Sequence, residues 1–302
     1  MSLLPTRYLD AVVALETLND PDDPDDPDEE PDFEALGSGV LVEVEFPDAD
    51  NQEEIVRFLF LVTARHVVVG QDTLYAKINA GPNATRYVLS SRDDEGPRWY
   101  DAEGYDVAVT LIDEEQWDAD GVDYTAVLPG GWLDVGELLA ADVGAGDEVF
   151  VCGFPLGLSG VERKYSIVRG GIIARLDADV IEEARGFMID CNVFPGNSGG
   201  PVFLKPLLRI GEDGKTLEYG TTFLIGIVDS YLPYHDEAVS VQTGNTRVVF
   251  EENSGLATVV PVDAIAEAIS DCLEALASSD DDDTPPTEGH ATKPASTPHQ
   301  PQ

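Results

Sequence analysis

Basic side chains are scarce in this chain of 302 residues. Lysine and arginine together number 17, against 59 aspartates and glutamates, and the formal net charge at pH 7 is −42. Such a field repels phosphate backbones and anionic lipid head groups, which argues against nucleic acid and the membrane as partners. The acids run through the whole chain, as in Asp113-Glu114-Glu115. Because salt screens this self-repulsion, the composition favours a halophilic source over an ordinary acidic protein.

Cysteine and long apolar runs are also rare. The three cysteines, Cys152, Cys191 and Cys272, are odd in number and match no metal-binding spacing, so we expect buried thiols and no disulfide framework. No segment has the length of a membrane span. The N-terminal residues are interrupted by Arg7 and Asp10 and lack a clean signal-peptide core. From these absences we expect a cytoplasmic protein.

Short runs of β-branched and apolar residues, separated by Gly, Pro, Asp and Asn, fill most of the chain. They begin at residues 39–46 and end at residues 257–260, and this pattern predicts an all-β barrel or sandwich. We expect a short helix over residues 8–18. A longer C-terminal helix is expected after Pro261, because the apolar residues that follow lie on one helical face.

Two segments have the composition of a solvated chain. Residues 20–28 alternate aspartate with proline, and the residues after Asp283 are rich in Pro, Thr and Ser. The sequence therefore divides into four parts. These are an N-terminal helix with an acidic Pro-rich linker (1–35), a first β-barrel (36–135), a second β-barrel with the C-terminal helix (136–277), and a disordered tail (278–302).

The sharpest chemical signal is the run FPGNSGGPV at residues 194–202. A serine hydroxyl attacks a carbonyl only when it sits on a constrained turn, near a base and beside donors for the oxyanion. The glycines around Ser198 permit such a turn, and the amides of Gly196 and Ser198 can point into one small space. A glycine-rich turn between strands is the alternative, but the segment favours a nucleophilic serine with an oxyanion hole.

Two further residues match this serine. His66 follows an apolar run and a small residue, which suits a base held at the end of a strand. Asp106 begins another apolar run, and behind the imidazole it would fix the tautomer and stabilise the imidazolium. Taken singly, His66 is better explained as a packed histidine, and Asp106 as one of the many acids that begin a strand in a chain this acidic. The order His66, Asp106, Ser198 is that of the chymotrypsin arrangement, with the first two in one barrel and Ser198 in the next.

At these residues the chain resembles the trypsin-like serine proteases, and among them the high-temperature-requirement (Deg-type) branch. The shared motifs are GSGV at 37–40, TARH at 63–66, DVAV at 106–109, GFPLG at 153–157, GGII at 170–173, PGNSGGP at 195–201 and IGI at 225–227. The resemblance covers residues 36–270. It implies two packed antiparallel six-stranded β-barrels, with the active site in the cleft between them. No PDZ-like domain is expected after the second barrel, so the usual regulation of that branch is not expected either.

The resemblance also implies substrate-binding residues. Val228, Asp229 and Ser230 would form the strand that pairs with the substrate backbone. Gly255, Leu256 and Ala257 would wall the specificity pocket, and Asn192 would lie near its base. Because Asn192 is not an acid, we expect a small or medium apolar preference rather than one for Lys or Arg. Asn197 is neutral where digestive members carry an aspartate, so activation by an ion pair with a freed N-terminus is not expected.

The predicted function is that of a serine endopeptidase. It would hydrolyse exposed or unfolded polypeptide through the Ser198-His66-Asp106 triad and an acyl-enzyme, with no metal or organic cofactor. The alternative is a catalytically silent or latent module that binds peptides in the same cleft. An acidic interaction or ion-binding protein is a third hypothesis, and it depends on the charge runs alone.

Overall fold

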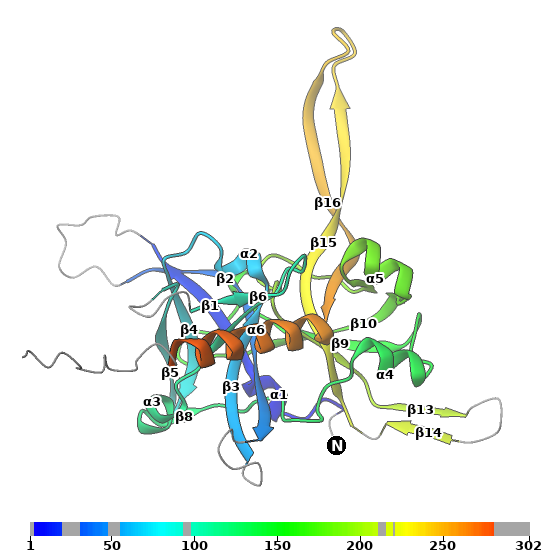
Figure 1. Cartoon of the computed structure of the whole chain (residues 1–302). Coiled ribbons are helices and arrows are strands. Elements are labelled where there is room, and N and C mark those ends of the chain that lie inside the picture. Colours follow the sequence, from blue (N-terminus) through cyan, green and yellow to red (C-terminus); the bar gives the residue numbers. More distant parts are fainter. Residues whose placement is uncertain are drawn as a thin grey trace, which may run out of the picture.

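The computed structural model describes residues 3–19, 31–47, 55–92, 98–210, 216–219 and 221–280. The expected acidic linker at 20–30 and the tail beyond residue 280 lie outside these residues. Within them the chain forms two β-rich halves and a long C-terminal helix, α6 (Val262–Asp280) (Figure 1). In the described parts of the chain, no helix is long and apolar enough to cross a membrane.

The first half is an eight-stranded antiparallel sheet with the order β5-β4-β1-β2-β3-β7-β6, and β8 pairs with β4. Its strands are β1 (Val12–Leu18), β2 (Phe33–Pro47), β3 (Ile55–Thr63), β4 (Thr73–Ala80), β5 (Asn83–Ser90), β6 (Tyr100–Asp101), β7 (Ala108–Leu111) and β8 (Val122–Asp123). Short helices α2 (Arg65–Val68) and α3 (Glu114–Ala119) join them.

The second half is a closed six-stranded barrel with the order β10-β11-β16-β15-β12-β9. Its strands are β9 (Glu148–Gly153), β10 (Ile167–Arg175), β11 (Phe187–Asp190), β12 (Pro201–Leu204), β15 (Phe223–Val239) and β16 (Thr246–Pro261). Helix α4 (Val135–Ala140), the 3-10 turn η1 (Pro155–Gly157), helix α5 (Ala178–Ala184) and a separate hairpin, β13 (Leu207–Ile210) with β14 (Thr216–Tyr219), complete it. The all-β class, a closed six-stranded barrel and the C-terminal helix are therefore confirmed. The first half differs, because it is an eight-stranded sheet where six strands were expected.

The predicted N-terminal helix over residues 8–18 is wrong. Helix α1 spans only Arg7–Asp10, and the chain then enters β1, which pairs with both β2 and β4. Residues 12–15 are all fully buried. A strand buried on both faces has a continuous apolar run, which periodicity does not distinguish from a helix. The first sheet thus begins at residue 12, not at residue 36.

One hydrophobic cluster joins the two halves. It contains Phe60 and Val62 of β3, Phe203 and Leu224 of the barrel, and Ile265 of α6, all fully buried. Helix α6 leaves β16 and lies across β6 and β7 of the first sheet (Figure 1). Because the halves share a core, the surfaces between them have a fixed relative position. The three cysteines are free and buried, as predicted.

Strands β15 and β16 continue beyond the barrel as a two-stranded arm, which covers residues 232–253 and projects from the body (Figure 1). The arm pairs from Pro233↔Asn253 to Val239↔Thr246. Its apolar side chains are exposed, among them Tyr234, Val248 and Phe250. The arm contributes nothing to the hydrophobic core clusters.

Candidate active site

His66 and Asp106 come together because their strands pair. Strands β3 and β7 are antiparallel, with Thr63 opposite Ala108, so the residues after β3 lie beside those before β7. His66 stands on the one-turn helix α2, and its Nδ1 lies 2.5 Å from Asp106 Oδ2. The backbone N–H of His66 donates to the other carboxylate oxygen at 2.9 Å. Asp106 therefore holds both the ring and the backbone of His66.

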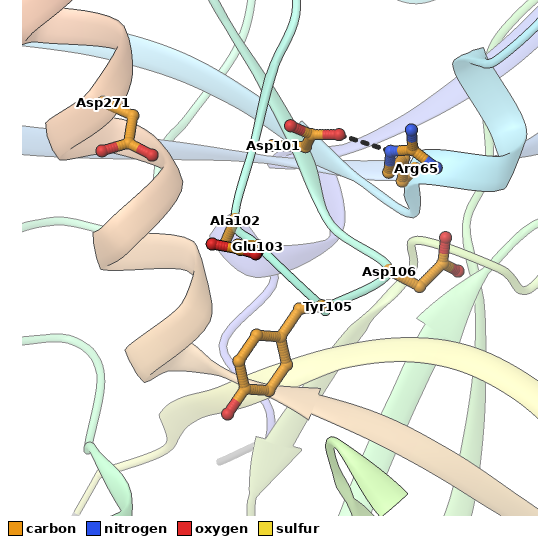
Figure 2. A pocket seen from close by; sticks show the side chains of 8 residues that line it. Arg65, Asp101, Ala102, Glu103, Tyr105, Asp106 and Asp271 are labelled. Atoms are coloured by element: carbon orange, nitrogen blue, oxygen red, sulfur yellow. Dashed lines mark hydrogen bonds and ion pairs between the residues drawn. The ribbon is translucent and has the colours of Figure 1, made fainter.

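An ion pair between Arg65 and Asp101 lies next to the contact between His66 and Asp106 and supports it. Arg65, beside His66, bonds to Asp101, which pairs across the β6–β7 ladder with Ala108 (Figure 2). The loop from Asp101 to Asp106 borders an open hollow of about 680 Å³, and Asp271 of α6 lies on its other side. The ion pair fixes the loop before Asp106 to the helix that carries His66.

The charges of the pair shift its pKa values in opposite directions. The hydrogen bond that His66 donates to the Asp106 carboxylate raises the pKa of His66 above its ordinary value of 6.5, although burial acts against it. Burial acts to raise the pKa of Asp106, but the hydrogen bonds and charge of His66 hold it below its ordinary value. The pair therefore favours an ionised carboxylate beside an imidazole of increased basicity.

Ser198 stands on a turn that only glycine neighbours allow. Gly196 and Gly199 have φ values of +95° and +77°. A Cβ at Gly199 would lie 2.2 Å from the Ser38 carbonyl oxygen, and one at Gly196 would lie 2.4 Å from that of Phe154. The turn is thus pressed against the first sheet, which carries His66.

Two backbone amides at the serine turn are left without a partner in the part of the chain that the structure describes. The N–H groups of Gly196 and Ser198 make no backbone hydrogen bond among the described residues. The carbonyls are bound elsewhere, because Leu156 N–H donates to Pro195 C=O at 2.7 Å and the buried Ser38 hydroxyl donates to Gly196 C=O at 2.6 Å. Two unpaired donors beside a serine form the arrangement that an oxyanion requires.

One pocket of about 280 Å³ brings these groups together. Its lining includes His66, Gly196, Ser198, Val228 and Ser230. Within the described residues, no hydrogen bond joins the His66 ring to the Ser198 hydroxyl. Such bonds are often long without substrate and shorten in the complex.

Nothing in the sequence pattern predicted a position for the Asp229 side chain, which the structure places beside His66 and Asp106. Its backbone belongs to β15, but its carboxyl group lies with His66 and Asp106, and the three side chains have polar atoms within 4.8 Å of one another. Burial raises the pKa of Asp229 to about 6, and a hydrogen bond and charge repulsion from Asp106 act in the same direction. Sequence reasoning missed this group. Strand alternation alone could not have placed it, because the successive residues Ser230 and Tyr231 both line the pocket.

The same three side chains are of types that bind metals. However, His66 Nδ1 and Asp106 Oδ2 are already hydrogen-bonded to each other at 2.5 Å. We assign no metal to them.

The predicted specificity residues lie together at the junction of β11 and β16. Ile189 pairs with Ala257, and Asp190 pairs with Leu256. A Cβ added at Gly255 would lie 3.6 Å from Asn192 Oδ1. These residues do not line the pocket of His66 and Ser198. A carboxylate that the sequence reasoning did not place, Asp190, lies equally near, with Oδ1 3.8 Å from the same position.

Comparisons with known proteins give a family and a fold. The family model described as a trypsin-like peptidase domain matches residues 37–205, a segment that contains His66, Asp106 and Ser198. Curated proteins give no match. Among solved structures, the chain is similar to "HtrA-type protease AlgW with decapeptide", with a TM-score of 0.47 and 19% identity over 89% of this chain and 66% of that one. It therefore spans slightly less than two thirds of that chain. It is also similar to the MamO protease domain from Magnetospirillum magneticum (apo form), with a TM-score of 0.40 and 13% identity over 87% of this chain and 97% of that one.

Proposed function

This chain belongs to the trypsin-like peptidase family, and from that premise we propose that it is a serine endopeptidase acting on exposed or unfolded polypeptide. The observation that carries the proposal is the shared pocket. It holds the Ser198 hydroxyl, the His66 ring backed by Asp106, and the unpaired amide of Gly196. These are the nucleophile, the base and the oxyanion donors that acyl transfer needs.

In this mechanism the Ser198 hydroxyl attacks the peptide carbonyl carbon while His66 takes its proton. Asp106 stabilises the resulting imidazolium, and the amides of Gly196 and Ser198 bind the oxyanion. Collapse of the tetrahedral intermediate forms a Ser198 ester and breaks the C–N bond, and His66 gives its proton to the leaving amine. Water, activated by His66, then hydrolyses the ester and restores the hydroxyl.

The edge of β15 supports binding of an extended peptide. The backbone of Val228 is bonded to Gly199 and Gly200, at 2.7 and 2.9 Å. The ladder between β12 and β15 ends where Pro201 pairs with Ile227, so Asp229 and Ser230 have no partner on that side of β15. A substrate strand can therefore pair here beside Ser198. The wall formed by residues 255–257 with Asn192 would receive the side chain before the cut bond, and a small or medium apolar group is our proposal for it.

A latent peptide-binding module remains the second candidate, because the His66 ring and the Ser198 hydroxyl are not hydrogen-bonded. A direct test compares cleavage of an unfolded protein such as casein, and labelling by a fluorophosphonate probe, at low and molar salt. The variants are Ser198→Ala and, as a matched control, Ser90→Ala, an exposed serine at the end of β5. Cleavage and labelling lost only in Ser198→Ala support the peptidase. Casein binding without cleavage or labelling in the wild type would contradict it and favour the latent module.

A further inference from the structure

One side chain at the root of the projecting arm, Asn253, is bonded to the segment that leads into the serine turn. Its amide nitrogen donates to the C=O of the buried Val193, and its Oδ1 accepts from Gly255 N–H at 2.8 Å. Among the described residues, Val193 C=O accepts no backbone hydrogen bond. Asn253 lies opposite Pro233 in the pair with which the arm begins (Figure 1). A half-buried side chain thus links the arm to the chain just before Ser198.

The bond to Val193 forms at a bulge in β16. Residues 254–256 lie opposite a single residue of β15, and Gly255 has the φ of +84° that glycine adopts without strain. Cys191 N–H donates to Gly255 C=O at 2.9 Å, after which the two segments form no further backbone bond in the described structure. The Asn253 side chain therefore supplies the next hydrogen bond where the strand ladder has ended.

Four successive carbonyl groups of the serine turn, from residue 193 to residue 196, each have a donor. The donors are Asn253 Nδ2 for Val193, Asn197 N–H for Phe194, Leu156 N–H for Pro195 and the Ser38 hydroxyl for Gly196. A trans peptide unit is planar and has its C=O and N–H on opposite sides, so a carbonyl that is held also fixes the direction of the next N–H. The four bonds together fix the orientation of the unpaired Gly196 N–H in the pocket of Ser198.

We infer that Asn253 is a positioning residue of the active site, whose side-chain amide holds the Val193 carbonyl and thereby keeps the Gly196 N–H directed at the oxyanion. Its effect on turnover rests on the proposed function. Its effect on the order of residues 191–197 does not, because that follows from the hydrogen bonds alone.

Two substitutions remove the donor in different ways. Asn253→Asp keeps an acceptor for Gly255 N–H but directs a carboxylate at Val193 C=O, whereas Asn253→Ala removes donor and acceptor together. Asn245→Asp is the matched control, because it adds the same charge at an exposed position at the far end of the arm. Two measurements apply to each variant: kcat and KM on a peptide substrate, counted per active site, and amide hydrogen exchange of residues 191–197 in the free protein.

The expected results separate the variants from the control. Asn253→Ala lowers kcat about tenfold and leaves KM within about twofold, because an oxyanion donor acts in the transition state and not in the bound substrate. Asn253→Asp lowers kcat at least as much, since its carboxylate repels the Val193 carbonyl. In both variants the amides of residues 191–197 exchange about fivefold faster, which is the factor that one ordinary hydrogen bond supplies. Asn245→Asp leaves turnover and exchange unchanged.

Other outcomes overturn the inference. Exchange that is unchanged in both Asn253 variants refutes the anchoring of the turn, whether or not the protein cleaves peptides. Faster exchange with an unchanged kcat, or a loss confined to KM, refutes the positioning role. If Asn253→Ala does not fold, Asn253→Asp decides both questions, because it keeps the bond to Gly255. A wild type that cleaves nothing, with exchange that rises in the variants as described, refutes the proposed function and supports the anchoring.

Discussion

Ser38 is the residue whose loss should damage both the fold and the oxyanion site. It lies in β2 with no exposed surface, and its hydroxyl donates to Gly196 C=O at 2.6 Å and accepts from Phe154 N–H at 3.0 Å. Both partners belong to the second half of the chain, so one hydroxyl joins the first sheet to the serine turn. A Cβ added at Gly153 would lie 2.7 Å from the same oxygen, so the two halves approach closely at Ser38.

The expected cost of Ser38→Ala follows from these two partners. The substitution leaves a buried carbonyl and a buried amide unsatisfied, and each costs about 1–3 kcal/mol. Allowing for relaxation, we expect the free energy of unfolding to fall by about 2–4 kcal/mol. Because Gly196 also loses its anchor, kcat should fall by about tenfold or more, since loss of a whole oxyanion donor costs about 100- to 1,000-fold.

Urea unfolding at fixed pH and salt measures the first effect, and steady-state hydrolysis of a peptide substrate measures the second. Ser90→Ala, on the exposed end of β5, is the control and should stay within about 0.5 kcal/mol of the wild type. A Ser38→Ala protein with an unchanged unfolding midpoint and an unchanged kcat would show that this hydroxyl does not support the serine turn.

The remaining predictions concern charge. The Glu16 side chain is 4% exposed, and its carboxylate lies 3.7 Å from Lys77 Nζ. Because Glu16→Ala leaves a buried charge without its partner, it should lower the free energy of unfolding by about 3–5 kcal/mol in a urea titration. Glu34→Ala, at an exposed position, is the control and should not lower it. The base, His66, must be neutral to accept a proton, and its pKa is raised, so kcat/KM should rise with pH around a midpoint above 6.5. Asp106→Asn should lower kcat about 10,000-fold. The contact between protonated His66 and Asp106 stabilises the fold below pH 6.5, and this contribution is lost as the pH rises through the raised pKa of His66. With a net charge of −42, the urea midpoint should rise from low to molar NaCl, and a fall would refute the halophilic interpretation.

The N-terminal segment shows where periodicity stops being informative. Residues 12–15 are apolar because the strand is covered on both faces, and the same run suits one face of a short helix. Its place between β2 and β4 depends on two long-range pairings, Val13 with Gly39 and Leu15 with Ala76. The residues near β1 in the sequence do not indicate which distant strands it pairs with.

Asp229 illustrates a similar limit in the site. The resemblance predicted its backbone as part of a substrate-binding strand, and β15 does carry it beside the pocket. The proximity of its carboxyl group to Asp106 depends on how the barrel is set against the first sheet. A strongly acidic sequence offers no way to select one aspartate among so many.

The sequence alone determined the backbone of the serine turn, because the glycines on both sides of Ser198 permit the positive φ values that the turn requires. It also determined the β-rich class, the buried thiols and the apolar face of α6, since these depend on composition and on spacing within one element. Only the tertiary structure decided that β1 is a strand, that the first half has eight strands, and that Asp229 joins His66 and Asp106. These features depend on contacts between residues far apart in the chain, and such contacts are selected by the packing of whole strands rather than by neighbouring residues.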